Sequence, residues 1–184
     1  FMSSLIGSKK NVKIFVLYLM ENINYPLDFV TLNDIVMQTD YVMYLDFAEG
    51  FHEMLRDGLI DNVGKDPEGN DIFAVTDKGR IVAGALKSDI LDSILDKSLA
   101  GALRYLDFRR RGIVTSCHSE RQPDGSYDVT FTMTEKGRVI MSASLAVDSE
   151  NRAERMKDNF RDRPEAIYRG MVALLAGNVN YLFD

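Results

Sequence analysis

The stretch FAVTDKGRIVAG, residues 73–84, is followed roughly sixty residues later by a near copy, FTMTEKGRVIMSA, residues 131–143. The two copies differ in their surroundings. After the first, apolar residues recur every three or four positions, as along one face of a helix. On both sides of the second, residues facing one way alternate with residues facing the other, as in strands. The same short motif is therefore predicted to begin a helix in the first half and to form a hairpin turn in the second.

Each copy predicts a specific backbone feature. Thr76 is expected to cap the helix by accepting from the amide of Gly79, and the helix is expected to run to about Arg110. Gly137, in the second copy, is expected to take positive φ in the turn. An internal duplication is the alternative explanation, because PEGND and PDGSY precede the two copies at similar distances.

Three helices are predicted before the first copy. Apolar residues at helical spacing within 12–23 predict the first helix. Thr31 is the expected N-cap of a short second helix at about 32–38. A third helix is predicted from about Met43, ending at Gly58 as a left-handed C-cap.

A hairpin is predicted between the third helix and the first copy of the motif. Turn residues separate two short apolar runs, 59–63 and 72–75. Three helices, a hairpin and an exit helix form the order of a winged helix-turn-helix domain. The alternative is a generic small helical domain with one hairpin.

The second half predicts a three-stranded antiparallel meander at about 112–148, covered by two helices. Ser149 is the expected cap of the first helix, and Pro164 suits the first turn of the second. The whole chain is thus predicted to be α+β, with a winged helix at 1–87, a linking and dimerisation helix at 88–111 and a small α+β domain at 112–184.

Longer segments resemble a known family. NYPLDFVTLNDIV, TDYVMYLDFAEGFHEMLRDGLI and RAERMKDNFRDRPEAIYRGMVALL together resemble an uncharacterised bacterial family, common in Gram-positive anaerobes and described only as a domain of unknown function. The resemblance implies an N-terminal winged helix and a C-terminal α+β domain, and it brings no activity or catalytic residues. Locally, MLRDGLI and FAVTDKGR resemble winged helices of the multiple-antibiotic-resistance and phenolic-acid-decarboxylase repressor families.

The composition argues against several classes of protein. A single cysteine, no charged-then-apolar leader and no long apolar span favour a protein of a reducing cytoplasm, neither secreted nor in a membrane. No phosphate-binding or dinucleotide-binding glycine motif occurs. Cys117 and His118 are adjacent in a predicted strand and point to opposite faces, so they form neither a catalytic pair nor a shared metal site. We therefore expect no enzyme, no cofactor and no metal.

A winged helix places its third helix in the major groove of double-stranded DNA. The residues expected at the nucleic acid are Tyr41, Met43 and Tyr44 around the start of the third helix, Lys9, Lys10 and Lys13 at the start of the first helix, Lys65 in the wing, and Arg80. A solvated helix start for the lysines and partial burial for the tyrosines are the alternatives. Arg109, Arg110 and Arg111 either end a helix, where positive charge complements the helix dipole, or contact an anion.

Charge is the main objection to DNA binding. The net charge is -6, and residues 1–87 carry eight Lys and Arg against thirteen Asp and Glu. Asp46, Glu49 and Glu53 are expected on the outward side of the third helix, where they would repel phosphates. The leading hypothesis is a homodimeric DNA-binding transcriptional regulator whose C-terminal domain either senses an unidentified small-molecule effector or serves in dimerisation. The alternative is a winged-helix module that binds a protein partner instead of DNA.

Overall fold

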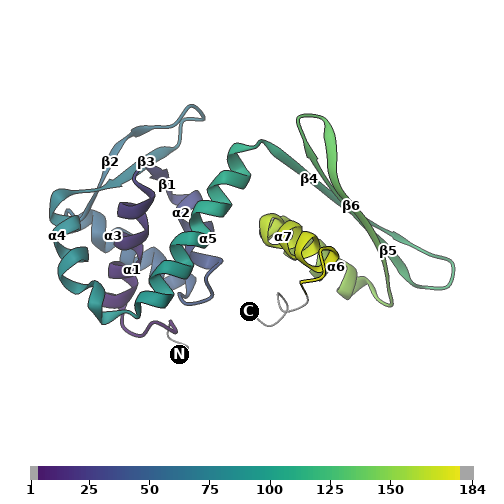
Figure 1. The fold of residues 1–184 in the computed structure, drawn as a ribbon, viewed down its shortest axis with the longest axis horizontal. Helices are drawn as coiled ribbons and strands as arrows, with labels where there is room; N and C mark the ends of the chain where they lie inside the picture. Colours follow the sequence, from purple (N-terminus) through teal and green to yellow (C-terminus); the bar gives the residue numbers. More distant parts are fainter. Residues whose placement is uncertain (1–3, 179–184) are drawn as a thin grey trace. The chain divides into compact units, whose positions relative to one another are not determined.

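The computed structural model describes residues 4–178, which form seven α-helices and two three-stranded antiparallel sheets (Figure 1). The chain divides into two units, Phe1–Arg104 and Tyr105–Asp184, and the division lies inside helix α5, Asp92–Arg110. Each unit contains one of the sheets. The predicted α+β class is confirmed.

The order of elements in the N-terminal unit is compatible with a winged helix-turn-helix. Its elements are α1 (Lys9–Ile23), β1 (Leu27–Asp28), α2 (Phe29–Met37), α3 (Tyr44–Arg56), β2 (Ile60–Lys65), β3 (Asp71–Val75) and α4 (Asp77–Leu86). The β2–β3 hairpin stands where a wing is expected, and Gly58 has the positive φ predicted for it, 69°. Strand β1 completes the sheet in the order β1-β3-β2.

Aromatic side chains hold α3 against its neighbours. Phe51 of α3 is 2% exposed and lies edge-on to Phe29 of α2 and Phe73 of β3, with both pairs of ring centroids 4.9 Å apart. Phe47, one turn earlier on α3, also packs on Phe29 at 5.4 Å. Edge-to-face packing of this kind stabilises a core beyond the burial of area alone. The cluster fixes the orientation of α3 relative to α2 and to the hairpin.

The start of α2 differs from the prediction. Asp28, not Thr31, is the N-cap, and its carboxylate accepts a hydrogen bond from the amide of Thr31 at 2.9 Å. Asp is as good an N-cap as Ser and better than Thr, and capping three residues earlier lengthens the helix by most of a turn. Leu27 and Asp28 also pair with β3, which the sequence pattern did not predict because a two-residue strand has no measurable periodicity.

The predicted continuous helix from Thr76 to about Arg110 is wrong. Helix α4 ends at Leu86, a 3₁₀ turn follows at Lys87–Asp89, and Ile90 is extended with φ -121° and ψ 140°. Ser and Asp side chains compete for backbone hydrogen bonds and so favour helix ends. The break also allows Ile90 to be buried, and Asp89 forms an ion pair with Lys10 of α1 at 2.8 Å.

The C-terminal unit is the predicted meander with two helices. Its elements are β4 (Ile113–Arg121), β5 (Tyr127–Glu135), β6 (Arg138–Val147), α6 (Glu150–Asp162) and α7 (Pro164–Leu175), and its strands lie in the order β4-β5-β6. Both helices lie on one side of the sheet (Figure 1). Phe160 of α6 packs on Phe131 of β5 at 5.0 Å. Pro164 begins α7 as expected, whereas Ser149 occupies the N-cap position of α6 without a side-chain capping bond.

The two copies of the opening motif use their glycines for different purposes. Thr76 caps α4 by accepting from the amide of Gly79 at 3.1 Å, as predicted. A Cβ added to Gly79 would lie 2.1 Å from the carbonyl oxygen of Leu59, so this glycine allows the helix start to approach the backbone that leads into β2. Gly137 instead has φ 80° and follows Lys136 at φ 49°, in the predicted tight turn of the β5–β6 hairpin.

Candidate nucleic-acid interface

Helix α3 begins without a side-chain cap of its own. Met43 is the N-cap residue, and its amide donates instead to the hydroxyl oxygen of Ser4 at 2.9 Å. The same hydroxyl donates to the carboxylate of Asp46, in the first turn of α3, and the amide of Ser4 donates to it as well. Ser4 therefore binds the backbone amide of the N-cap residue from a distant part of the sequence, and it holds Asp46 to the N-terminal segment.

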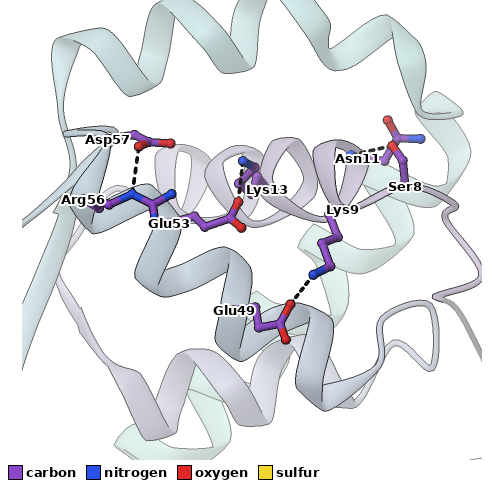
Figure 2. Close-up of polar contacts among 8 residues, drawn as sticks. All are labelled: Ser8, Lys9, Asn11, Lys13, Glu49, Glu53, Arg56 and Asp57. Carbon is purple, nitrogen blue, oxygen red and sulfur yellow. Dashed lines mark hydrogen bonds and ion pairs between the residues drawn. The ribbon is translucent and has the colours of Figure 1, made fainter. Parts of the chain in front are cut away.

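Two ion pairs join α1 to α3 (Figure 2). Lys9 binds Glu49, and Lys13 binds Glu53 with its ammonium nitrogen 2.8 Å from the carboxylate. The spacing of four residues on each helix places both pairs along the same line between the two helices. Together with the bond from Ser4 to Asp46, they give a partner to each of the three α3 carboxylates that sequence analysis expected to point outward.

Lys13 changes the titration of Glu53. It holds the pKa of Glu53 below its ordinary value of 4.5, through their hydrogen bond first and the attraction of charges second. Because the folded-state pKa is lowered, the stability contributed by this pair is complete above pH 4.5 and is lost as the pH falls through the lowered value. At neutral pH the carboxylate is fully charged and paired.

A substitution of Lys13 tests this pairing. In Lys13→Gln, we expect the pKa of Glu53 to rise toward its ordinary value, because the hydrogen bond from the ammonium group and the attraction of its charge, the two largest causes of the lowering, are removed, while the weaker effects of Arg56 and Lys9 remain. The measurement is a carbon-13 NMR titration of the Glu side-chain carboxyls of the wild type and the variant. Lys10→Gln, which removes a lysine of the same helix that binds Asp89 instead, is the control. If Glu53 titrates alike in all three proteins, the pair does not exist in solution.

Opposite its buried residues, α3 exposes a stripe whose one carboxylate, Glu49, is paired with Lys9 of α1. We call Leu45, Ala48, His52 and Arg56, at steps of three and four residues, the outer face of α3. Leu45 is 70% exposed, His52 is exposed, and the side chain of Arg56 is 72% exposed. Tyr44, 53% exposed, lies at the N-terminal end of the same helix. This face combines apolar contact area with two basic groups.

Sequence analysis missed the outer face. The prediction placed Asp46, Glu49 and Glu53 outward because they lie on the side of the helix away from Phe47, Phe51 and Met54. The buried residues are Phe47, Gly50, Phe51 and Met54. A helical projection centred on all four would have put His52 and Arg56 opposite them.

The other predicted cations lie at three separate places. Lys10 binds Asp89 at 2.8 Å, and Lys65 binds Asp71 at 2.9 Å within the hairpin. Arg80 binds Asp77 of its own helix at 2.8 Å. Arg80 also lines a surface groove between the C-terminal end of α1, strand β3 and helix α4. Lys9 and Lys13 are thus the predicted cations whose contacts lie on α3.

The remaining predicted residues are Tyr41 and Met43 in the N-terminal unit and the three arginines Arg109, Arg110 and Arg111 in the C-terminal unit. Met43 is 42% exposed, whereas Tyr41 is half-buried and its carbonyl accepts from the amide of Ile6. In the other unit, Arg111 forms a two-pronged bond with the carboxylate of Glu135, at 2.8 and 3.0 Å. Arg109 lies over the ring of Tyr105, and Arg110 ends α5 in an exposed position.

The hairpin has a strongly acidic surface. Its residues 60–75 include Asp61, Asp66, Glu68 and Asp71 but a single basic residue, Lys65. Lys65 donates to the carbonyl of Gly69 at 3.2 Å as well as to Asp71. Hydrogen bonds from Asn70 lower the pKa of Asp66, so this carboxylate stays charged at neutral pH. The hairpin is therefore poorly suited to lie against a phosphate backbone.

Other kinds of chemistry have little support in the described residues. Between residues 4 and 178, no group of three or more His, Cys, Asp or Glu side chains is placed to hold a metal ion. Cys117 points toward the core of the C-terminal unit and His118 points to solvent, as predicted from their adjacent strand positions. Within the same residues, no helix combines the length and the apolar composition that a membrane crossing needs.

The chain matches the family described as "Domain of unknown function (DUF4364)" over residues 12–175. It belongs to this family. The match spans both units, from α1 to the end of α7, and it agrees with the resemblance found in the sequence. Neither the curated proteins nor the solved structures include a match to the chain.

Proposed function

We propose that this DUF4364 protein is a cytoplasmic DNA-binding transcriptional regulator that inserts α3 into the major groove. The observation that carries the proposal is the pairing of Asp46, Glu49 and Glu53 with Ser4, Lys9 and Lys13. Free carboxylates on this helix would repel the phosphates, and pairing weakens that repulsion. The helix order of the N-terminal unit, compatible with a winged helix-turn-helix, supports the same use of α3.

The outer face of α3 supplies the contacts in this proposal. Arg56 can bind a phosphate or, bidentately, the O6 and N7 atoms of guanine. His52 can donate a hydrogen bond to a base acceptor in the major groove of DNA, and Leu45 offers apolar contact to a thymine methyl group. Tyr44 can donate its hydroxyl to a phosphate. Few basic groups take part, so we expect weak binding with a shallow dependence on salt.

Binding to duplex DNA tests the proposal. We expect a fluorescently labelled random-sequence duplex to bind at about 20 mM salt and to dissociate as salt is raised. Arg56→Ala is expected to weaken binding about tenfold and to reduce the slope of log affinity against log salt by about one. Fluorescence anisotropy titrations at several salt concentrations measure both quantities.

Arg80→Ala is the matched control, because Arg80 is also an exposed arginine paired with a neighbouring Asp but lines the groove beside α4. We expect its affinity to equal that of the wild type. Equal losses in both variants, or no binding of the wild type even at low salt, would contradict the proposed use of α3. If affinity falls in Arg56→Ala alone, genomic footprinting with the wild-type protein would identify the target sequence.

The acidic hairpin favours a second candidate function, binding of a basic protein partner. In this case the wing would supply charge, and Met43, Tyr44 and Leu45 would supply apolar contact area. Asp61→Asn with Glu68→Gln would then weaken the complex, while Asp66 is left in place because it holds the hairpin turn. Binding of a basic partner that is lost in this variant, without binding to DNA at low salt, would favour the second candidate.

A further inference from the structure

Strand β6 forms an edge of the C-terminal sheet and has no charged side chain after its first residue, Arg138. Its residues 139–147 read VIMSASLAV, without Asp, Glu, Lys, Arg or Pro. In the described residues 4–178, no backbone hydrogen bond joins β6 to anything but β5. An edge of this length and composition is a ready site for another strand, and proteins usually block such edges with charge or proline.

The opposite edge of the same sheet is protected in the usual way. Strand β4 carries His118, Glu120 and Arg121 in its C-terminal half, and all three are exposed. The two edge strands belong to the same sheet and have similar lengths, 9 and 10 residues. The difference in how the two edges are protected therefore lies in the side chains of the strands and not in the fold. Pairing is thus discouraged at β4 and left open at β6.

Apolar side chains on β6 are also left uncovered. Helix α6 packs mainly on β4 and β5 and less on β6. Leu145, on the face that the helices cover, is 50% exposed, and Val139, on the other face, is 55% exposed. A further strand beside β6 would cover both side chains as well as satisfy the free backbone groups.

We propose that a second copy of this chain pairs with β6, antiparallel, to form a two-fold symmetric dimer with a continuous six-stranded sheet. The ends of the strand are complementary in charge: Arg138 begins β6 and Asp148 follows it, so antiparallel pairing brings each Arg138 to the Asp148 end of the other copy. Asp148 also binds Arg152 at 3.2 Å, but its side chain is 72% exposed and has oxygen lone pairs to share.

The interior of the strand fits a copy of itself. Residues 139–147 carry no charged side chain, so pairing two copies of this segment brings no like charges together. Pairing centred on Ala143 places Met141 opposite Leu145 of the second copy on the helix-covered face. On the other face it places Ser142 opposite Ser144 of the second copy, where two hydroxyls can bond.

The mass of the chain in solution tests the dimer. We expect sedimentation equilibrium at tens of micromolar to give about twice the 20.8 kDa of one chain. Ser142→Lys with Ser144→Lys is expected to return the mass to that of one chain, since it gathers four ammonium groups at the pairing site. Both side chains are exposed, so each chain can still fold; circular dichroism confirms that it does.

Ser116→Lys with His118→Lys is the matched control, because it adds two lysines to the same face of the sheet at the β4 edge. We expect it to remain a dimer.

Ala143→Cys in a Cys117→Ser background is expected to form a covalent dimer on mild oxidation, because the two new thiols meet at the symmetry axis. A monomeric wild type, a dimeric Ser142→Lys, Ser144→Lys variant, or equal loss of the dimer in both lysine variants would overturn the proposal.

Discussion

Replacing Gly79 with alanine is expected to lower the free energy of unfolding by about 3 kcal/mol. The new Cβ would lie 2.1 Å from the carbonyl oxygen of Leu59 and 2.8 Å from a methyl carbon of Val75. The first of these atoms belongs to the backbone that receives hydrogen bonds from the hydroxyl and the amide of Thr76, so it has little freedom to move. Helix α4 would have to shift away from the start of β2.

Gly84→Ala provides the control for this substitution. Gly84 lies in the same helix, has nothing within 4 Å of an added Cβ, and does not have positive φ. Alanine is therefore expected to stabilise the protein by up to about 1 kcal/mol, the difference in helix propensity. Urea unfolding followed by circular dichroism measures both variants. A Gly79→Ala variant as stable as Gly84→Ala would show that α4 and the β2 strand do not approach as closely as described.

Phe51→Ala is expected to cost about 4 kcal/mol. Phe51 is almost completely buried and touches rings from α2 and β3 in addition to its own helix, so its removal leaves a cavity where three elements meet. The loss includes the edge-to-face contacts with Phe29 and Phe73 as well as the transfer of the ring to water. Urea unfolding again measures the change.

Tyr44→Ala is the matched control for Phe51→Ala. It removes an aromatic ring from the same helix at a position that is 53% exposed, and its cost is expected to stay within about 0.5 kcal/mol. If the two variants were equally stable, the aromatic cluster would not be what positions α3 in the N-terminal unit.

The parts of the fold that the sequence predicted depend on local patterns. Period-two alternation around Gly137 predicted the meander, and the Thr76 to Gly79 cap predicted the start of α4, because both signals lie within a few residues. The break near Ile90 escaped prediction, since the apolar spacing continues through it. Burial of Ile90 and the ion pair of Asp89 with a lysine distant in sequence favour the break, and neither can be read from a local pattern.

The candidate site was less predictable than the fold for the same reason. A carboxylate on a helix is expected to be free in solvent, and only a binding partner from another part of the chain reveals that it is paired. Lys13 and Glu53 are 40 residues apart, and Ser4 and Asp46 are 42 apart. The pairing of charges between helices thus decides which side of α3 is available, and that pairing depends on tertiary structure.

The most direct test of the central claim is residue-by-residue mapping of the DNA contact. The backbone amide NMR signals of the full chain are followed while a random-sequence duplex is added at about 20 mM salt. We predict the largest changes at residues 43–56, centred on His52 and Arg56, with little change at the groove formed by α1, β3 and α4. Changes confined to that groove or to residues 105–178, or no change at any residue, would contradict the claim that α3 binds DNA.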